Sequence, residues 1–134
     1  MKIAVIGSRE FTDYDTLKKI LDADIDICST NFIISGGAPG ADSLAARYAK
    51  EHKIPLIVYE AEWNNLTHPD ALIKINKYGK QYDARAGFRR NSILIEEADK
   101  VIAFHDGTSR GTLDSIQKAK ELKKKIKIVK YLFL

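Results

Sequence analysis

Short apolar runs alternate along this chain with longer segments whose apolar residues recur every three or four positions. The runs end in glycine, serine or charged residues, which is typical of buried strands that lead into loops. The longer segments have the spacing of helices that pack one apolar face on a sheet. Since parallel strands need crossover helices, the alternation predicts an α/β fold, a single Rossmann-like domain over residues 1–134 with a mainly parallel sheet of about five strands flanked by helices. The predicted strands are residues 2–6, 31–35, 56–59, 100–104 and 126–131.

Four helices are predicted between these strands. Asp13 can cap the first helix, and the second begins near Ala41. The third opens at Arg89 with apolar Ile93, Leu94 and Ala98, and the fourth follows the loop that ends at Thr112. The positions expected to face the sheet in the first, second and fourth helices are Leu17, Ile20, Leu21, Ile25, Leu44, Ala45, Tyr48, Ala49, Leu113, Ile116, Ala119 and Leu122.

The regular pattern is lost between Glu60 and Phe88. A long polar stretch of this kind inside a compact domain is usually a functional loop or a lid. Its middle piece, Ala71 to Tyr78, is compatible with a short helix.

The composition, 45% hydrophobic and 30% charged residues, fits one domain with a core of its own. The single cysteine, Cys28, excludes an internal disulfide and has no basic neighbour to activate it, so we expect a packing residue in a reducing compartment. No stretch approaches the ~20 apolar residues of a membrane helix. The chain opens on a strand pattern rather than on a signal peptide. We therefore expect a cytoplasmic protein with no membrane partner.

The formal net charge of +4 raises the question of nucleic-acid binding. Lysines near the end of a helix complement its dipole, however, and no aromatic residues alternate with them to stack bases. We interpret this cluster as a solvated surface, and nucleic acid is not the expected partner. Its lysines are Lys118, Lys120, Lys123, Lys124, Lys125 and Lys127.

The stretch from Ser35 to Asp42 holds three glycines between a predicted strand and a predicted helix. Glycines allow a sharp turn and leave amide groups accessible at a helix start, where the dipole favours an anion. The spacing is neither the dinucleotide fingerprint nor the Walker loop, so it names no cofactor. Ordinary capping of the helix by Asp42 is the alternative interpretation.

Several loops follow predicted strands and should meet at one edge of the sheet, where open parallel sheets bind ligands. They are residues 7–9, residues 35–42, the loop with Trp63, and residues 105–112. Arginines and helix-start amides recognise phosphates. Trp63, Tyr82 or Phe88 could offer a flat face to a base, although packing in the core or in a lid explains each of them as well.

Short motifs lie along the whole chain, at residues 7–9, 35–42, 61–63, 78–80, 86–91, 98–99, 103–107 and 109–112. Taken together, these motifs resemble the YspA/YpsA-related branch of the SLOG superfamily, and the resemblance runs from the first strand to the last helix. It implies a Rossmann-like fold and a site for nucleotides or nucleotide-derived ligands, in sensors tied to phages or to bacterial conflict systems, and association as a homodimer or higher homo-oligomer.

The superfamily also includes the LOG phosphoribohydrolases, whose motif PGGxGTxxE supplies a catalytic glutamate. Aligning Gly111 and Thr112 with that motif places Ser115 at the glutamate position. A serine cannot act as a carboxylate does in glycoside cleavage. Asp114 lies one residue away, about 100° around a helix, so a hydrolase would have to use it differently.

We therefore expect binding of a nucleotide or nucleotide-derived ligand, ADP-ribose-like or a nucleoside phosphate, by a sensor or sequestering protein. Nucleoside-monophosphate hydrolysis and single-stranded nucleic-acid binding are the alternatives. We expect no cofactor, and no metal, because His105 has no second histidine at ligand spacing. The expected ligand-binding residues are Gly7, Ser8, Arg9, Ser35, Gly36, Gly37, Gly40, Asp42, Trp63, Arg89, Arg90, Asn91, His105, Gly107, Ser109, Gly111 and Thr112.

Overall fold

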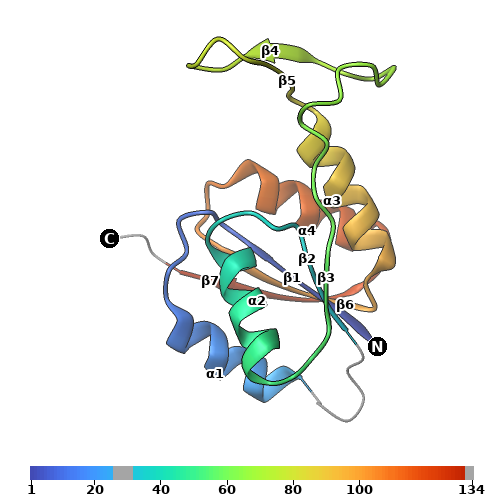
Figure 1. Ribbon diagram of the computed structural model, residues 1–134. Coiled ribbons are helices and arrows are strands. Elements are labelled where there is room, and N and C mark those ends of the chain that lie inside the picture. The colour runs from blue at the N-terminus through green and yellow to red at the C-terminus, as the bar shows by residue number, and fades with distance from the viewer. Residues whose placement is uncertain (26–31, 132–134) are drawn as a thin grey trace.

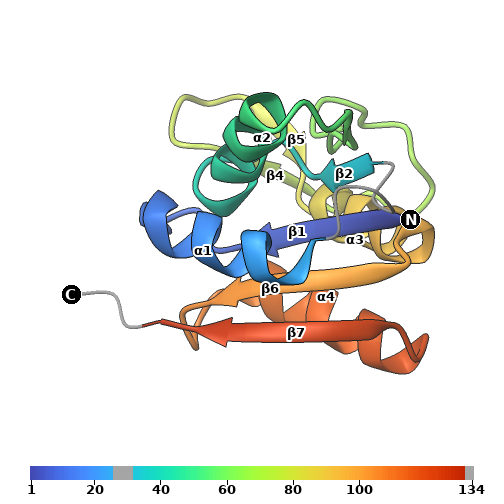
Figure 2. The same ribbon diagram turned by 90° about the horizontal axis from the view of Figure 1, so that it is seen from below.

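Five parallel strands form the central sheet of the computed structural model, which describes residues 1–25 and 32–131. The order across the sheet is β3-β2-β1-β6-β7, and Figure 2 shows β1, β6 and β7 running in the same direction. The α/β fold class is therefore confirmed. The sheet strands are β1 (Lys2–Gly7), β2 (Phe32–Ser35), β3 (Leu56–Val58), β6 (Lys100–His105) and β7 (Lys125–Lys130), and the helices are α1 (Tyr14–Asp24), α2 (Ala41–Glu51), α3 (Ala86–Glu97) and α4 (Arg110–Glu121).

The two faces of the sheet build two separate cores, because successive strand residues point to opposite faces. Ile3 and Val5 of β1 pack with residues of α1 and α2, among them Leu17 and Tyr48. Ala4 and Ile6 pack on the other face, where Leu94 is one of the α3 and α4 residues in the cluster. The continuous apolar runs of the central strands are explained by this burial on both sides.

Asp13 caps α1 as expected, since its carboxylate accepts hydrogen bonds from the Thr16 backbone N–H and hydroxyl at 3.1 and 2.5 Å. Two other expectations about helices are wrong. The third helix begins at Ala86 rather than at Arg89. Leu113 of α4 and its C-cap residue Leu122 are 45% and 51% exposed, because the buried face of α4 is formed by Thr112, Ser115, Ile116 and Ala119.

The segment 71–78 is not a helix. It contains strand β4 (Ile73–Ile75), which pairs with β5 (Gln81–Asp83) in an antiparallel hairpin. The alternation of Ile73, Lys74 and Ile75 is a strand pattern, and a turn around Asn76 reverses the chain. Figure 1 shows this hairpin standing apart from the sheet, beyond the start of α3.

Two sequence expectations fall outside the described residues: Cys28 as a packing residue and Asn31 as the start of the second strand. Within residues 1–25 and 32–131, no helix is both long and apolar enough to cross a membrane.

Candidate functional site

The order of the strands reverses between β1 and β6, which are neighbours in the sheet. The chain places β2 and β3 on one side of β1, and then returns to place β6 and β7 on the other side. Loops that leave neighbouring strands at such a point diverge and open a crevice, where ligands of open α/β sheets bind. The loops after β1 and β6 flank this crevice.

The first turn after β1 is tightly packed at Gly7. A side chain there would come within 2.6 Å of the Ala41 Cβ and 2.7 Å of the Phe104 carbonyl oxygen, so only glycine fits. The next residue, Ser8, donates its N–H to Phe104 O at 3.2 Å and accepts the Ala41 N–H at 3.2 Å. These contacts bring β1, β6 and the start of α2 together at one end of the sheet.

A cavity of about 460 Å³ lies at this end of the sheet. The loops after β1, β2 and β6 contribute mainly polar residues to its wall. The segment around α3 contributes apolar residues together with Arg90 and Asn91. The lining residues are Ile6, Gly7, Ser8, Arg9, Glu10, Gly36, Ala38, Asp42, Trp63, Ala84, Gly87, Phe88, Arg90, Asn91, Leu94, Asp106, Ser109, Gly111, Thr112 and Ser115.

The glycine loop needs its glycines for conformation as well as for space. Gly37 and Gly40 have φ angles of +71° and +81°, the region in which side chains are strained. Gly40, not Asp42, is the N-cap residue of α2. The capping alternative for Asp42 is therefore wrong.

The Asp42 carboxylate turns back onto the glycine loop and is buried, with 8% of the residue exposed. It accepts a hydrogen bond from the Ala38 N–H at 3.1 Å. Burial raises the pKa of Asp42 to about 6, against the opposing effects of the Ala38 and Gly36 N–H groups and of the Arg90 and Arg9 charges. The loop thus satisfies part of its own amides with an internal carboxylate, so it is not the open phosphate cradle that the glycines alone indicate.

Arg90 is held beneath the same loop. Its guanidinium donates to the carbonyl oxygens of Gly36 and Tyr59, the latter at 3.3 Å, and its Nε donates to the Asn91 side chain at 3.0 Å. Burial lowers the pKa of Arg90 from its usual value, although the Asp42 charge opposes this effect. Arg90 therefore fixes the loop and adds positive charge to the cavity wall.

A second hollow of about 300 Å³ continues from the cavity along the outside of the glycine loop. It shares Arg9, Trp63 and Arg90 with the cavity and adds Gly37, Pro39, Glu60 and Ala61 to the lining. Arg9 forms no ion pair with any other residue of the described chain. Its guanidinium is thus available to an anion in either hollow.

The loop after β6 also satisfies some of its own amides. The Asp106 carboxylate accepts the N–H groups of Thr108 and Ser109 at 2.9 and 2.8 Å, and the Ser8 hydroxyl at 3.2 Å. These hydrogen bonds keep the pKa of Asp106 below its usual value. The loop is thereby held in one shape against the turn after β1.

The start of α4 offers amides that the helix cannot use itself. Arg110, Gly111 and Thr112 form its first turn, where backbone N–H groups have no acceptor within the helix. Gly111 and Thr112 line the cavity, and the position of a Cβ on Gly111 is open space. This first turn is therefore the part of the site that can accept a phosphate with its amides and dipole together.

Aromatic rings also line the cavity. Trp63 packs so closely on α3 that a Cβ at Gly87 would lie 2.8 Å from its Cη2 atom. Its carbonyl oxygen accepts the Asp83 N–H at 2.8 Å, which ties the Trp63 loop to strand β5. Phe88 lines the same wall and is 42% exposed. This wall can contact the flat face of a base.

Twelve of the residues expected to bind the ligand line one or both hollows: Gly7, Ser8, Arg9, Gly36, Gly37, Asp42, Trp63, Arg90, Asn91, Ser109, Gly111 and Thr112. Ser35, Gly40, Arg89, His105 and Gly107 do not line either of them. Ser35 is buried and its hydroxyl accepts the Gly37 N–H at 3.3 Å. Arg89 instead forms an ion pair with Asp83.

His105, one of the expected ligand-binding residues, is the last residue of β6. It is buried and does not line the cavity. Its Nδ1 lies 3.9 Å from the Asp106 carboxylate. The next residue, Asp106, faces the site instead, which agrees with the alternation of side chains along a strand. In the described chain no group of His, Cys, Asp and Glu residues could hold a metal ion.

The residue at the position of the hydrolase glutamate does line the cavity. Ser115 is 3% exposed and belongs to the lining. Asp114 is turned away, because its carboxylate accepts from Lys118 Nζ at 2.7 Å and from the Asn91 side chain at 3.4 Å.

Sequence reasoning missed part of the cavity lining. The apolar residues Ile6 and Leu94 belong to regular elements and look like core positions in the sequence. Phe88 was named as a possible face for a base, and Asp106 lies in the loop 105–112 that was expected at the site, but neither was among the expected ligand-binding residues. The place of Asp106, two residues after the predicted strand 100–104, was the usable signal. The other lining residues outside that set are Ile6, Glu10, Ala38, Ala84, Gly87, Leu94 and Ser115 in the cavity, and Pro39, Glu60 and Ala61 in the second hollow.

The fold and the site define an α/β protein of the Rossmann-like class, with a cavity at the switch point of its sheet. Residues 1–66 match the model of the YspA, cpYpsA-related SLOG family, which confirms the resemblance seen in the motifs and supports nucleotide-related binding as the general function. No curated protein sequence matches the chain significantly.

Solved structures with the same fold include two examples of DNA processing protein A. The Helicobacter pylori protein, described as binding single-stranded DNA in a unique mode, is 23% identical, with a TM-score of 0.63 over 96% of this chain and 64% of that chain. The Streptococcus pneumoniae protein is 22% identical, with a TM-score of 0.69 over 95% of this chain and 49% of that chain. The chain thus spans about half to two thirds of their lengths.

A third structure, the structural genomics target TM1055, is 18% identical and has a TM-score of 0.58 over 93% of this chain and 71% of that chain. At these identities the three likenesses establish the shared fold.

Proposed function

We propose that this protein binds a nucleotide or nucleotide-derived ligand in the cavity at the switch point, as a sensor or sequestering protein. The observation that carries the proposal is the combination of groups that line one cavity. Arginine side chains and the first turn of α4 share this lining with the aromatic rings of Trp63 and Phe88. A nucleotide needs both kinds of group, because its phosphates are anionic and its base is flat and largely apolar on its faces. The volume of about 460 Å³ lies within the range of small-molecule sites.

The proposed orientation follows from the free donors. The phosphates contact the amides of Gly111 and Thr112 and the guanidinium of Arg9. The base lies against the wall formed by Trp63 and Phe88. Asp42 and Asp106 keep the two loops in shape from within. The negative charge of Asp42 disfavours a phosphate deep under the glycine loop.

Binding without cleavage is favoured by the chemistry at α4. Cleavage of an N-glycosidic bond needs a carboxylate near the anomeric carbon. The side chain at the corresponding place is Ser115, and the adjacent carboxylate of Asp114 is engaged by Lys118. Hydrolysis of a nucleoside monophosphate remains the enzymatic alternative, and it requires Asp114 to leave that ion pair.

The test is a thermal-shift series with AMP, ADP-ribose, NAD and cyclic ADP-ribose isomers, followed by mass spectrometry of the samples. A ligand at 100 times its Kd raises the stability by about 2.7 kcal/mol. Recovery of the intact ligand supports a binding protein, and release of free base or ribose phosphate supports the hydrolase. The absence of a shift with every nucleotide contradicts the proposal.

The variant pair Gly111→Asp and Gly111→Asn isolates the charge at α4. Both side chains enter open space, and both remove a glycine from a helix. An aspartate in the first turn also interacts favourably with the helix dipole, so Gly111→Asp should remain folded. We expect it to lose nucleotide binding, whereas Gly111→Asn keeps more of it. Equal affinities for the two variants contradict the proposed phosphate position.

Gly37→Asp is a poorer test of phosphate binding, although Gly37 belongs to a glycine-rich motif just as Gly111 does. Its φ angle is +71°, and a Cβ there would lie 2.8 Å from Val58 Cγ1. A loss of binding in this variant would report a distorted loop as readily as a lost phosphate contact.

Single-stranded DNA binding is a second candidate, and it revises the expectation that nucleic acid is not a partner. It is favoured by the likeness to the Helicobacter pylori protein and by the net charge of +4. It predicts an affinity that falls steeply as the salt concentration rises.

Association as a homodimer is a further prediction, and sedimentation velocity over a range of concentrations tests it.

A further inference from the structure

The β4–β5 hairpin, defined here as residues 71–83, is anchored firmly at its base. Asp83 is fully buried there. Its carboxylate accepts the N–H groups of Leu72 and Arg85 at 3.1 and 2.9 Å, and it forms an ion pair with Arg89 of α3. Arg85 and Arg89 also contact the Asp70 carboxylate, at 2.8 and 3.7 Å. The hairpin therefore leaves the body of the protein in a defined direction (Figure 1).

The tip of the hairpin is ordered by one side chain. The Asn76 Oδ1 accepts the N–H groups of Tyr78 and Lys80 at 2.9 and 3.0 Å, and the Asn76 N–H donates to the Lys80 carbonyl oxygen at 2.9 Å. Gly79 supplies the positive φ angle of +78° that the turn needs. The backbone of this tip is held in place before any partner arrives, which lowers the entropic cost of binding.

The hairpin exposes groups that a two-stranded element cannot bury by itself. Tyr78 is 81% exposed and Ile75 is 66% exposed. Lys74, Lys77 and Lys80 are also exposed, and none of them forms an ion pair with another residue of the described chain. Residues 71–82 contain no acidic side chain. Unpaired cations beside an exposed aromatic ring are the features that single-stranded nucleic acid recognises.

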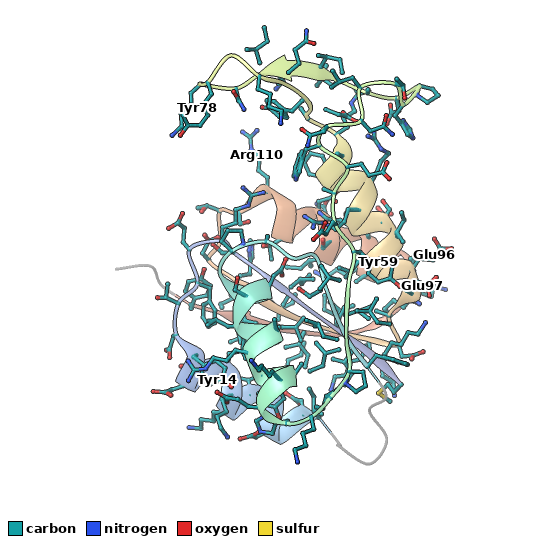
Figure 3. All side chains as sticks on the ribbon, in the orientation of Figure 1. Tyr14, Tyr59, Tyr78, Glu96, Glu97 and Arg110 are labelled. Carbon is teal, nitrogen blue, oxygen red and sulfur yellow. The ribbon has the colours of Figure 1, made fainter. Side chains whose placement is uncertain are left out.

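The hairpin is also connected to the cavity lining through an aromatic contact. Tyr82 of β5 packs edge-on against Trp63 at 6.4 Å between ring centroids, and Trp63 lines the cavity. Lys74 is the strand partner of Tyr82, so the two side chains share one face of the hairpin. In Figure 3 the Arg110 side chain extends from the start of α4 toward the hairpin that carries Tyr78.

We propose that the hairpin is a second contact surface for single-stranded nucleic acid, with the phosphates near its lysines and a base on Tyr78. The inference rests on the second candidate under the proposed function, single-stranded DNA binding, and it assigns one nucleotide of the strand to the cavity and the neighbouring ones to the hairpin. A hairpin-to-hairpin contact between two copies of the chain would place like charges together, which disfavours it.

The test measures fluorescence anisotropy with a fluorescein-labelled 12-nucleotide oligothymidine at several salt concentrations. The variant K74Q/K77Q/K80Q removes the hairpin charge. The matched control K19Q/K50Q/K120Q removes the same charge from exposed positions on helices α1, α2 and α4. Tyr78→Ala removes the exposed ring without changing the charge.

We expect the hairpin variant to lose about tenfold or more in affinity, and the slope of log K against log salt to fall by about two, as the loss of three phosphate contacts implies. The control should keep most of the affinity, and Tyr78→Ala should weaken binding with an unchanged slope. Equal losses in the hairpin and control variants would overturn the inference, because the charge would then act without regard to position.

Failure of this inference can be distinguished from failure of the proposed function. A thermal shift with mononucleotides but no anisotropy change with the oligonucleotide overturns the hairpin surface and leaves the cavity proposal standing. Oligonucleotide binding that depends on the hairpin, without any mononucleotide shift, supports the hairpin surface and contradicts the cavity proposal. Absence of oligonucleotide binding together with concentration-dependent self-association through the hairpin also overturns the inference, in favour of a second copy.

Discussion

The buried carboxyl of Asp42 should make the stability of this protein depend on pH in an unusual direction. Burial raises its pKa in the folded protein from an ordinary value of 3.8 to about 6. A carboxyl whose folded pKa is raised takes up a proton on folding, so its contribution is greatest at low pH and is lost as the pH rises through about 6. Stability should therefore increase as the pH falls from 8 to 5.

The size of the effect follows from the same two pKa values. Between pH 8 and pH 5 the linkage relation gives a gain of about 1.4 kcal/mol. For a domain of this length that is about 5 °C in melting temperature. Carboxyls with lowered pKa values, such as those of Asp13 and Asp106, weaken the fold only at lower pH, as the pH falls below their ordinary pKa values.

Urea denaturation of the wild type and of Asp42→Asn at pH 8, 7, 6 and 5 measures this difference directly. The asparagine keeps an oxygen that can accept the Ala38 N–H, and it has no charge to bury. The free energy of unfolding of the variant should change less with pH than that of the wild type. Parallel pH profiles for the two proteins would refute the reasoning.

Three further predictions concern the site and its supports. Asp83→Ala should lower the melting temperature and increase proteolysis near residues 71–83, because it leaves Arg89 and two N–H groups without their acceptor; equal proteolysis of wild type and variant would contradict this. Trp63→Ala should weaken nucleotide binding by about 1–3 kcal/mol in isothermal titration, as loss of a stacking face implies, with Trp63→Phe retaining part of the affinity. Ser115→Glu should release nucleobase from AMP in a mass-spectrometric assay whereas Ser115→Gln should not, and inactivity of both would show that more than the carboxylate is missing.

Much of the fold could be predicted because burial leaves a periodic trace in the sequence. The apolar runs of the sheet strands and the spacing of Leu17 and Leu21 reflect packing on the two faces of the sheet. Errors occurred where an apolar residue lies on the solvent side, as Leu113 does, or where a short strand has no buried face, as in β4. Periodicity reports burial, so it fails where exposed residues are apolar.

The candidate site could be predicted in outline for a topological reason. Loops that follow parallel strands meet at one edge, so Gly7, Gly36 and Gly111 come together without any knowledge of the contacts. The sequence did not reveal which polar groups of each loop form hydrogen bonds with one another. Asp42 and Asp106 occupy loop amides that the glycine motifs alone assign to phosphate.

By itself, the sequence determined the alternation of strands and helices, the parallel sheet and the placing of glycine loops at the ends of strands, because these depend on local periodicity and on chain connectivity. Only the tertiary structure decided which donors are free, that Ser115 rather than Asp114 faces the cavity, and that the β4–β5 hairpin projects from the body. These features depend on the directions of side chains from segments far apart in the chain. Hydrogen-bond partners such as Asp42 with Ala38, or Arg90 with Gly36, are fixed only when the packed elements bring them within reach.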